Sequence, residues 1–339
     1  MSTSFKVRRV ALMALCVSAA CLFTACASMD DQARATAQEA SGPARSVLER
    51  KLLDITKEQE ELFERMGKAQ ISEDDFERRI LVIASRYDEL ISANPNNVDL
   101  LIIYGKFLRR INQNDRAHVM FSHADQLQDD IAVLKQQIGN YLAETGQYSE
   151  ALAYYVRAQE LEPETAVYHY GIGELLATFR DRFKEDLVYS DDMLDRGIMS
   201  AFGKAVELDP ANKDFAFRMG EAFYDLAKPD WDRADAYWLE VSQRADLTKF
   251  ERDVVRLHRA RVLCEKGQRK DALKLLREDV EPFLAATRMR LLKRISEEDA
   301  AAAAAMQEAS DAAAPAGEGA DNAEAPLRDG TGVMEEAAQ

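Results

Sequence analysis

Residues 132–165 decide the fold, and they read AVLKQQIGNYLAETGQYSEALAYYVRAQELEPET. Apolar residues recur at three- and four-residue spacing on both sides of the Gly-Gln-Tyr sequence at 146–148, and a proline follows at position 163. This spacing places the apolar side chains of each half on one face of a helix, while glycine and proline mark turns. The stretch therefore predicts two antiparallel helices joined by a short turn.

The same pattern recurs at a fixed period on both sides of this stretch. Tyr104-Gly105 lies 34 residues before Ile138-Gly139, and Ile172-Gly173 lies 34 residues after it. Met219-Gly220 follows after 47 residues, so thirteen extra residues are inserted, which the sequence places at about 178–190. A fixed period of this length indicates a stacked array of helix pairs.

At these residues the chain resembles the tetratricopeptide repeat family, whose pattern is an apolar residue before glycine, then Ala-x-x-x-aromatic, then proline. Matching residues form about five units over 98–280, including units at 213–244 and 249–280. The resemblance implies an all-α fold of helix-turn-helix pairs stacked in a right-handed superhelix, with disordered termini. The aromatic residue usual near the start of each first helix is replaced in every unit, by Leu101, Lys135, His169, Ala216 and Arg256.

The ends of such an array need caps, because one helix pair cannot bury its own apolar faces. Residues 46–97 predict N-terminal capping helices, the first ending at Gly67 and the second beginning with a capping-box-like Ser72 and Asp75. Residues 281–295 predict a capping helix at the other end, which is expected to pack through Phe283, Met289, Leu291 and Leu292.

The first 25 residues predict an export signal peptide. Lys6, Arg8 and Arg9 form a basic start, an apolar run follows over 10–25, and no acidic residue occurs before Asp30. A transmembrane anchor is the alternative interpretation. Spanning a bilayer takes about twenty apolar residues, however, and this run is shorter.

Cys26 is the predicted lipid attachment site. Phe23-Thr24-Ala25-Cys26 resembles a bacterial lipobox, which implies a lipidated Cys26, a flexible tether over 26–45 and an outer-membrane lipoprotein that faces the periplasm. Ordinary signal-peptidase cleavage at Ala25-Cys26-Ala27 is the alternative, since this triplet also has small residues on both sides of its centre.

The charge of the chain narrows the choice of partners. It has 44 basic and 60 acidic residues, a net charge of −16, and such a surface repels phosphate backbones, so nucleic acid is not an expected partner. Residues 296–339 are rich in alanine and acidic residues and lack aromatic ones. They predict a disordered tail, beyond a frayed alanine helix at most, that either solubilises the protein or attracts a basic partner.

The sequence contains no pattern that indicates catalysis. H-E-x-x-H, C-x-x-C, P-loop, G-x-G-x-x-G and G-x-S-x-G strings are absent. His118 and His123 are five residues apart and do not share a helical face, and Cys264 on an apolar face predicts a buried structural thiol. We therefore expect no catalytic residue, no metal and no cofactor.

The candidate binding site follows from the resemblance. In this family the first helix of each pair lines a concave groove, and side chains between the packing positions face the ligand. Unit by unit, this implies Ile102, Lys106, Arg109, Gln136, Asn140, Tyr170, Glu174, Phe217, Glu221 and Tyr224. Tyr170, Phe217 and Tyr224 form an aromatic shelf in this hypothesis; the alternative is that they are ordinary core between repeats.

Two functions are compatible with these features. The leading hypothesis is a non-enzymatic scaffold for protein–protein interaction, which holds envelope proteins or peptide segments in an outer-membrane or periplasmic assembly. The alternative is a periplasmic ligand-binding partner of a solute transporter, with a small molecule between the repeats. A cavity lined by Tyr170, Phe217 and Tyr224 would favour the transporter partner, and an open groove of peptide width would favour the scaffold.

Overall fold

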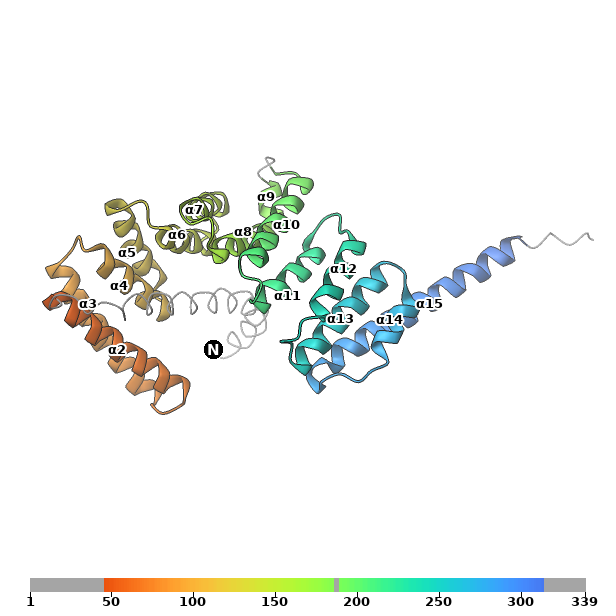
Figure 1. The fold of residues 1–339 in the computed structure, drawn as a ribbon, viewed down its shortest axis with the longest axis horizontal. Coiled ribbons are helices and arrows are strands. Elements are labelled where there is room, and N and C mark those ends of the chain that lie inside the picture. Colours follow the sequence, from red (N-terminus) through yellow and green to blue (C-terminus); the bar gives the residue numbers. More distant parts are fainter. Residues whose placement is uncertain (1–45, 186–188, 314–339) are drawn as a thin grey trace, which may run out of the picture. The chain divides into compact units, whose positions relative to one another are not determined.

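The structure, a computed structural model, describes residues 46–185 and 189–313, with backbone alone for 307–313 (Figure 1). All regular secondary structure in these residues is helical, which confirms the predicted all-α class. The predicted signal peptide, Cys26, the tether and the tail beyond residue 313 lie outside the described residues. No helix in the described part combines the length and apolar content that a membrane span requires.

Internal contacts divide the chain into two compact units, one ending at Leu247 and the other beginning at Thr248. The first unit consists of antiparallel helix pairs, as the repeat pattern predicts. Its helices are α2 (Val47–Gly67), α3 (Glu73–Ala93), α4 (Val98–Arg110), α5 (Asn114–Leu127), α6 (Ala132–Glu144), α7 (Tyr148–Leu161), α8 (Ala166–Thr178), α9 (Arg180–Glu185), α10 (Asp191–Leu208), α11 (Lys213–Ala222), the 3-10 turn η1 (Phe223–Asp225) and α12 (Trp231–Ser242).

The capping hairpin α2–α3 begins where polar residues satisfy the free backbone N–H groups of a helix start. The Ser46 side chain accepts from the backbone of Glu49, and the Glu49 side chain accepts in return from the Ser46 N–H at 2.8 Å. Ser72 accepts from the Asp75 N–H at 3.2 Å, as the sequence predicts. Caps of this kind stabilise a helix by about 1 kcal/mol each.

In the four repeat pairs from α4–α5 to α11–α12, a glycine of the first helix faces an aromatic ring of the second. A Cβ atom added at Gly105 would lie 2.5 Å from the Phe121 ring, and one at Gly220 would lie 2.4 Å from the Trp238 ring. Real Cβ atoms do not approach so closely, so alanine at either position would force the two helices apart. This contact is the physical reason for the recurring glycine in the sequence pattern.

The turn inside each pair explains where the array is interrupted. Gly146 joins α6 to α7 with φ +87°, and Asn112 holds the equivalent place between α4 and α5 with φ +60°. Glycine and asparagine tolerate this left-handed conformation better than other residues. Thirty-four residues after Gly146 the chain has Arg180, and here it enters the short helix α9 instead of turning directly into α10. Residues 180–185 of the insertion therefore form a separate short helix.

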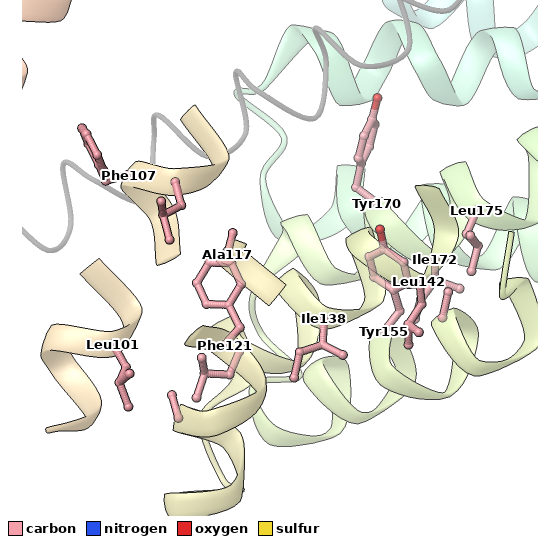
Figure 2. Close-up of a cluster of buried hydrophobic side chains, with 14 of the residues drawn as sticks. Leu101, Phe107, Ala117, Phe121, Ile138, Leu142, Tyr155, Tyr170, Ile172 and Leu175 are labelled. Atoms are coloured by element: carbon pink, nitrogen blue, oxygen red, sulfur yellow. The ribbon is translucent and has the colours of Figure 1, made fainter. Parts of the chain in front are cut away.

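Buried side chains from consecutive pairs form one continuous core through the first unit. Figure 2 shows part of this cluster, with Phe121 of α5 beside Ile138 of α6, and Tyr155 of α7 near Ile172 of α8. Each second helix thus packs its large residues against the first helix of the next pair. This sharing of core between neighbours is what the repeat pattern requires.

The second unit comprises α13 (Lys249–Glu265), α14 (Arg269–Leu276), the 3-10 turn η2 (Pro282–Leu284) and α15 (Ala285–Ala313). Leu291 and Ile295 of α15 are buried against the α13–α14 pair, together with the free thiol of Cys264. The expected packing of Phe283 and Met289 is wrong, because Phe283 on η2 is 92% exposed and Met289 on α15 is 59% exposed. The helix also continues to Ala313, eighteen residues beyond the predicted end of the cap at Ile295.

Candidate functional site

The predicted binding residues lie on the first helices of consecutive pairs in the first unit. We call this set the first-helix surface. It comprises Ile102, Lys106 and Arg109 of α4, Gln136 and Asn140 of α6, Tyr170 and Glu174 of α8, Phe217 and Glu221 of α11, and Tyr224 of η1.

Arg109 links α4 to α6, which are the first helices of two consecutive repeat pairs. Its guanidinium donates to both carboxylate oxygens of Glu144 at the end of α6, at 2.8 and 3.0 Å. Asn114 donates to the same carboxylate at 3.2 Å. Lys106, one turn earlier on α4, is half-buried and has no ion pair among the residues that the structure describes. Of the two predicted cations, Lys106 is therefore the one whose charge is available to a ligand.

The α6 residues present amide groups. Asn140 accepts a hydrogen bond from the Tyr155 hydroxyl, so its orientation is fixed by the second helix of its own pair. Gln136 is 3% exposed, and its carbonyl oxygen has no hydrogen-bond partner. Gln136 is therefore part of the buried interior between the helices, and its oxygen is an unsatisfied buried acceptor rather than one exposed to a ligand.

Tyr170 belongs to the core rather than to an exposed aromatic shelf. Its ring is 2% exposed, stacks on Phe215 at 4.9 Å between centroids and meets Phe202 edge-on at 5.6 Å. Phe217 packs edge-on against Trp238, and Tyr224 packs against Trp231. The three predicted rings thus pack against other aromatic side chains, and no two of them share a partner. For Tyr170 the structure favours the core interpretation that the sequence left open.

Glu174 is paired with a residue that sequence reasoning missed, Arg218 of α11. Arg218 Nε donates to Glu174 at 2.6 Å, Arg218 Nη2 pairs with Asp225 of η1 at 2.9 Å, and the guanidinium lies 4.5 Å from the centre of the Phe202 ring. The side chains of Arg218 and Glu174 are largely buried, so this pair locks α8 to α11. In the sequence it is visible only as an arginine directly after Phe217.

Titratable groups in the described part of the chain do not form a reactive cluster. No three His, Cys, Asp or Glu side chains there are arranged to hold a metal ion. Burial raises the pKa of the Cys264 thiol, which favours its unreactive protonated form. Burial, and to a lesser degree Arg261, lowers the pKa of His258 to about 4, so this imidazole is neutral at pH 7.

No model of a known protein family matches the sequence, and no curated protein matches it. Solved structures do share the helical repeat. YrrB, described as a TPR protein with an unusual peptide-binding site, is 17% identical with a TM-score of 0.46 over 61% of this chain and 93% of its own. PilW, described as a widely conserved type IV pilus biogenesis factor, is 13% identical with a TM-score of 0.47 over 69% and 92%. PilF of Pseudomonas aeruginosa is 13% identical with a TM-score of 0.45 over 68% and 91%. At these values the likeness concerns the repeat architecture, and it carries over no partner.

Proposed function

We propose that this chain is a non-enzymatic scaffold for protein–protein interaction, which binds a segment of a partner protein along the first-helix surface. The observation that carries the proposal is that polar side chains of consecutive first helices contact one another. Arg109 of α4 pairs with Glu144 of α6, and Glu174 of α8 pairs with Arg218 of α11. These pairs hold α4 beside α6 and α8 beside α11, and a row of neighbouring first helices suits an extended ligand better than a single reacting group.

The chemistry of this surface supports a peptide as the ligand. Lys106 offers a cation, and Phe217 and Tyr224 offer half-buried aromatic rings. Aromatic and cationic residues are frequent anchors of protein interfaces.

The test is site-specific photocrosslinking in the native envelope. A benzophenone amino acid at Lys106 or at Phe217 should give discrete adducts with one or a few proteins. The same probe at Arg157 of α7 or Glu207 of α10, exposed on second helices, should give none. Adducts of equal yield at all four positions would contradict the proposal. A small molecule that co-purifies with the protein, without any crosslinked protein, would favour the transporter partner instead.

We also propose that the chain is an outer-membrane lipoprotein facing the periplasm, lipidated at Cys26. The support is the basic start, the apolar run and the lipobox-like sequence before Cys26. Intact mass of the membrane-extracted protein should show a chain that begins at Cys26 with added acyl mass. Cys26→Ala should lose this mass together with membrane fractionation. A chain that begins at Ser28 without lipid would indicate a free periplasmic adaptor.

A further inference from the structure

The second unit exposes two large apolar side chains close together in the sequence. Phe283 on η2 is 92% exposed and Met289 on α15 is 59% exposed, although the sequence pattern predicts that both pack in the cap. Leu291 and Ile295 fill that packing instead. One exposed apolar residue is ordinary, so what matters is the chemistry of the side chains around these two.

Cations share this side of the helix. We call the set the outer face of α15, and it comprises Phe283, Ala286, Met289, Arg290 and Lys293, all of them exposed. Separations of three and four residues place side chains on one side of a helix, so these residues form a row. Residues 282–296 contain four basic residues and no acidic one. The outer face thus combines apolar groups with positive charge alone.

The cations of the outer face are accessible to an external anion. Arg290 has no ion pair among the described residues, and its guanidinium donates to Thr287 Oγ1 at 3.0 Å. Lys293 Nζ lies 3.5 Å from a Glu297 oxygen, and both of these side chains are at least 66% exposed. Exposed pairs of this kind are weak in water, so the Lys293 ammonium can still approach another anion.

The acidic residues beside the start of α15 are already paired within the second unit. The pairs are Glu278 with Arg256, Asp279 with Arg288 at 3.8 Å, and Glu281 with Lys249 at 2.8 Å. Arg277 lies at the same end, because Arg288 Nη2 donates to its carbonyl oxygen at 3.4 Å. The Arg277 side chain is exposed and has no ion pair in the described part of the chain. The surplus of charge here is therefore positive.

The second unit as a whole has a charge opposite to that of the chain. Residues 248–295 contain 14 basic and 7 acidic residues, a net charge of +7, whereas the whole chain has a net charge of −16. Summed positive charge attracts anions, and it does so most strongly where many anions lie on one surface. The second unit is thus the part of the chain suited to an extended anionic surface.

We infer that the outer face of α15 binds the surface of a bilayer that contains anionic phospholipids. Arg290 and Lys293 lie at the level of the phosphate groups, and Phe283 and Met289 enter the boundary between headgroups and acyl chains. A basic helix with aromatic and aliphatic side chains is suited to lie in this plane. The contact is weak and reversible by itself. It therefore orients an anchored chain, and in this respect the inference rests on the proposed lipid at Cys26.

The test is co-sedimentation of the proposed mature chain, residues 26–339 with Cys26→Ala, with lipid vesicles. The vesicles consist of phosphatidylcholine alone or with about 30% phosphatidylglycerol, which supplies the anionic headgroups. We expect half of the protein to bind at on the order of 1 mM lipid in the anionic vesicles, and at least about fivefold weaker binding to phosphatidylcholine alone. Salt at about 0.5 M should remove most of this difference, because it screens the charges.

Matched variants locate the contact. Phe283→Ala should weaken binding to the anionic vesicles about tenfold, while Leu81→Ala, at an apolar residue 64% exposed in the first unit, should leave it unchanged. Lys293→Gln should weaken binding about three- to fivefold. Lys57→Gln is its control, because Lys57 also pairs with an exposed glutamate four residues later, Glu61. All four replaced side chains are largely exposed, so the fold stays intact.

Three results would overturn the inference. They are no binding to the anionic vesicles, equal binding to both kinds of vesicle, and equal effects of the variants and their controls. A benzophenone amino acid at Phe283 that labels an acidic envelope protein and no lipid would also overturn it, in favour of a protein partner. The test chain carries no lipid, so its binding is independent of the intact mass at Cys26 and of the photocrosslinks at Lys106 and Phe217.

Discussion

The junction of α5 with the α6–α7 pair, which we call the first junction, and the junction that follows it are built on the same repeat and have opposite character. At the first junction His118, Ser122 and Asp125 of α5 leave a pocket of about 300 Å³ beside α6 and α7. At the second junction, which α7 forms with α8 and α9, Leu152 and Val156 pack into the core and the inserted helix α9 supplies Phe183. The residue types at a few positions of a second helix thus decide whether a junction between repeats is filled or leaves a pocket.

The second junction should carry more stability than the first, and Phe183→Ala tests this most strongly. Phe183 is fully buried and packs edge-on against Tyr189, so its removal should lower the free energy of unfolding by about 3 kcal/mol. Both tryptophans, Trp231 and Trp238, lie in the first unit, so their fluorescence in urea reports that unit alone. Tyr154→Ala at the first junction is the control, with a loss of about 1 kcal/mol or less because that ring is half-buried. Equal losses would remove the distinction between the junctions.

Arg180 holds the insertion in place, and its replacement should have the next largest effect. Arg180 pairs with Asp191 and Asp195 of α10, both at 2.7 Å, and is itself largely buried. Arg180→Met should cost about 1.5 kcal/mol, since Asp195 keeps hydrogen bonds from the backbone N–H groups of Ala227 and Lys228.

The matched control for Arg180 is Arg157→Met on α7. Arg157 forms an exposed pair with Glu160 three residues away, and such surface pairs contribute little. Urea unfolding followed by tryptophan fluorescence should show almost no change. A loss at Arg157 as large as that at Arg180 would mean that the insertion is not anchored by its buried ion pairs.

Converting the first junction into a copy of the second should close it. His118→Leu with Ser122→Val introduces the residues found 34 positions later, and apolar side chains in place of incompletely bonded polar ones should raise the free energy of unfolding by about 1 kcal/mol. Urea unfolding followed by tryptophan fluorescence measures this change. A variant less stable than the original chain would show that the polar side chains of α5 do not weaken the junction.

The smallest expected difference between the junctions is their response to pH. Because burial holds the pKa of His118 below its usual value, the unfolded chain binds a proton first as the pH falls below about 6.5. The contribution of this residue to stability therefore falls as the pH drops from about 6.5 toward the folded pKa of His118. His118→Leu should flatten this dependence of the free energy of unfolding on pH. A steeper slope in that variant would contradict the assignment of a neutral imidazole.

Much of this architecture was predictable because it depends on local spacing. The glycine–aromatic contacts, the left-handed turn at Gly146 and the Ser72 cap each involve residues whose types and separations reveal the geometry. The burial of Tyr170 was not predictable, since it depends on Phe202 and Phe215 from two other helices.

The division into two units and the pocket differ in whether the sequence reveals them. The division after Leu247 interrupts no repeat pattern, so nothing in the spacing marks it. The pocket did have a sequence signal. Alignment of α5 with α7 at a separation of 34 residues places His118 and Ser122 opposite Leu152 and Val156, and a polar residue at an apolar repeat position marks an interface that does not close.

The length of α15 has a mechanical consequence. Residues 296–313 continue the helix beyond Ile295, the last buried residue on it, and the side chains of 299–306 are exposed. At 1.5 Å per residue this stretch spans about 27 Å, and fully extended it would span about 60 Å. Glu298 and Asp299 at its base pair with Arg269 of α14, so a pull applied at the far end would first unwind the exposed turns beyond them, before it loaded these ion pairs or the packing of Leu291 and Ile295. The extension can thus act as an elastic element, which lengthens under tension while the fold behind it stays intact.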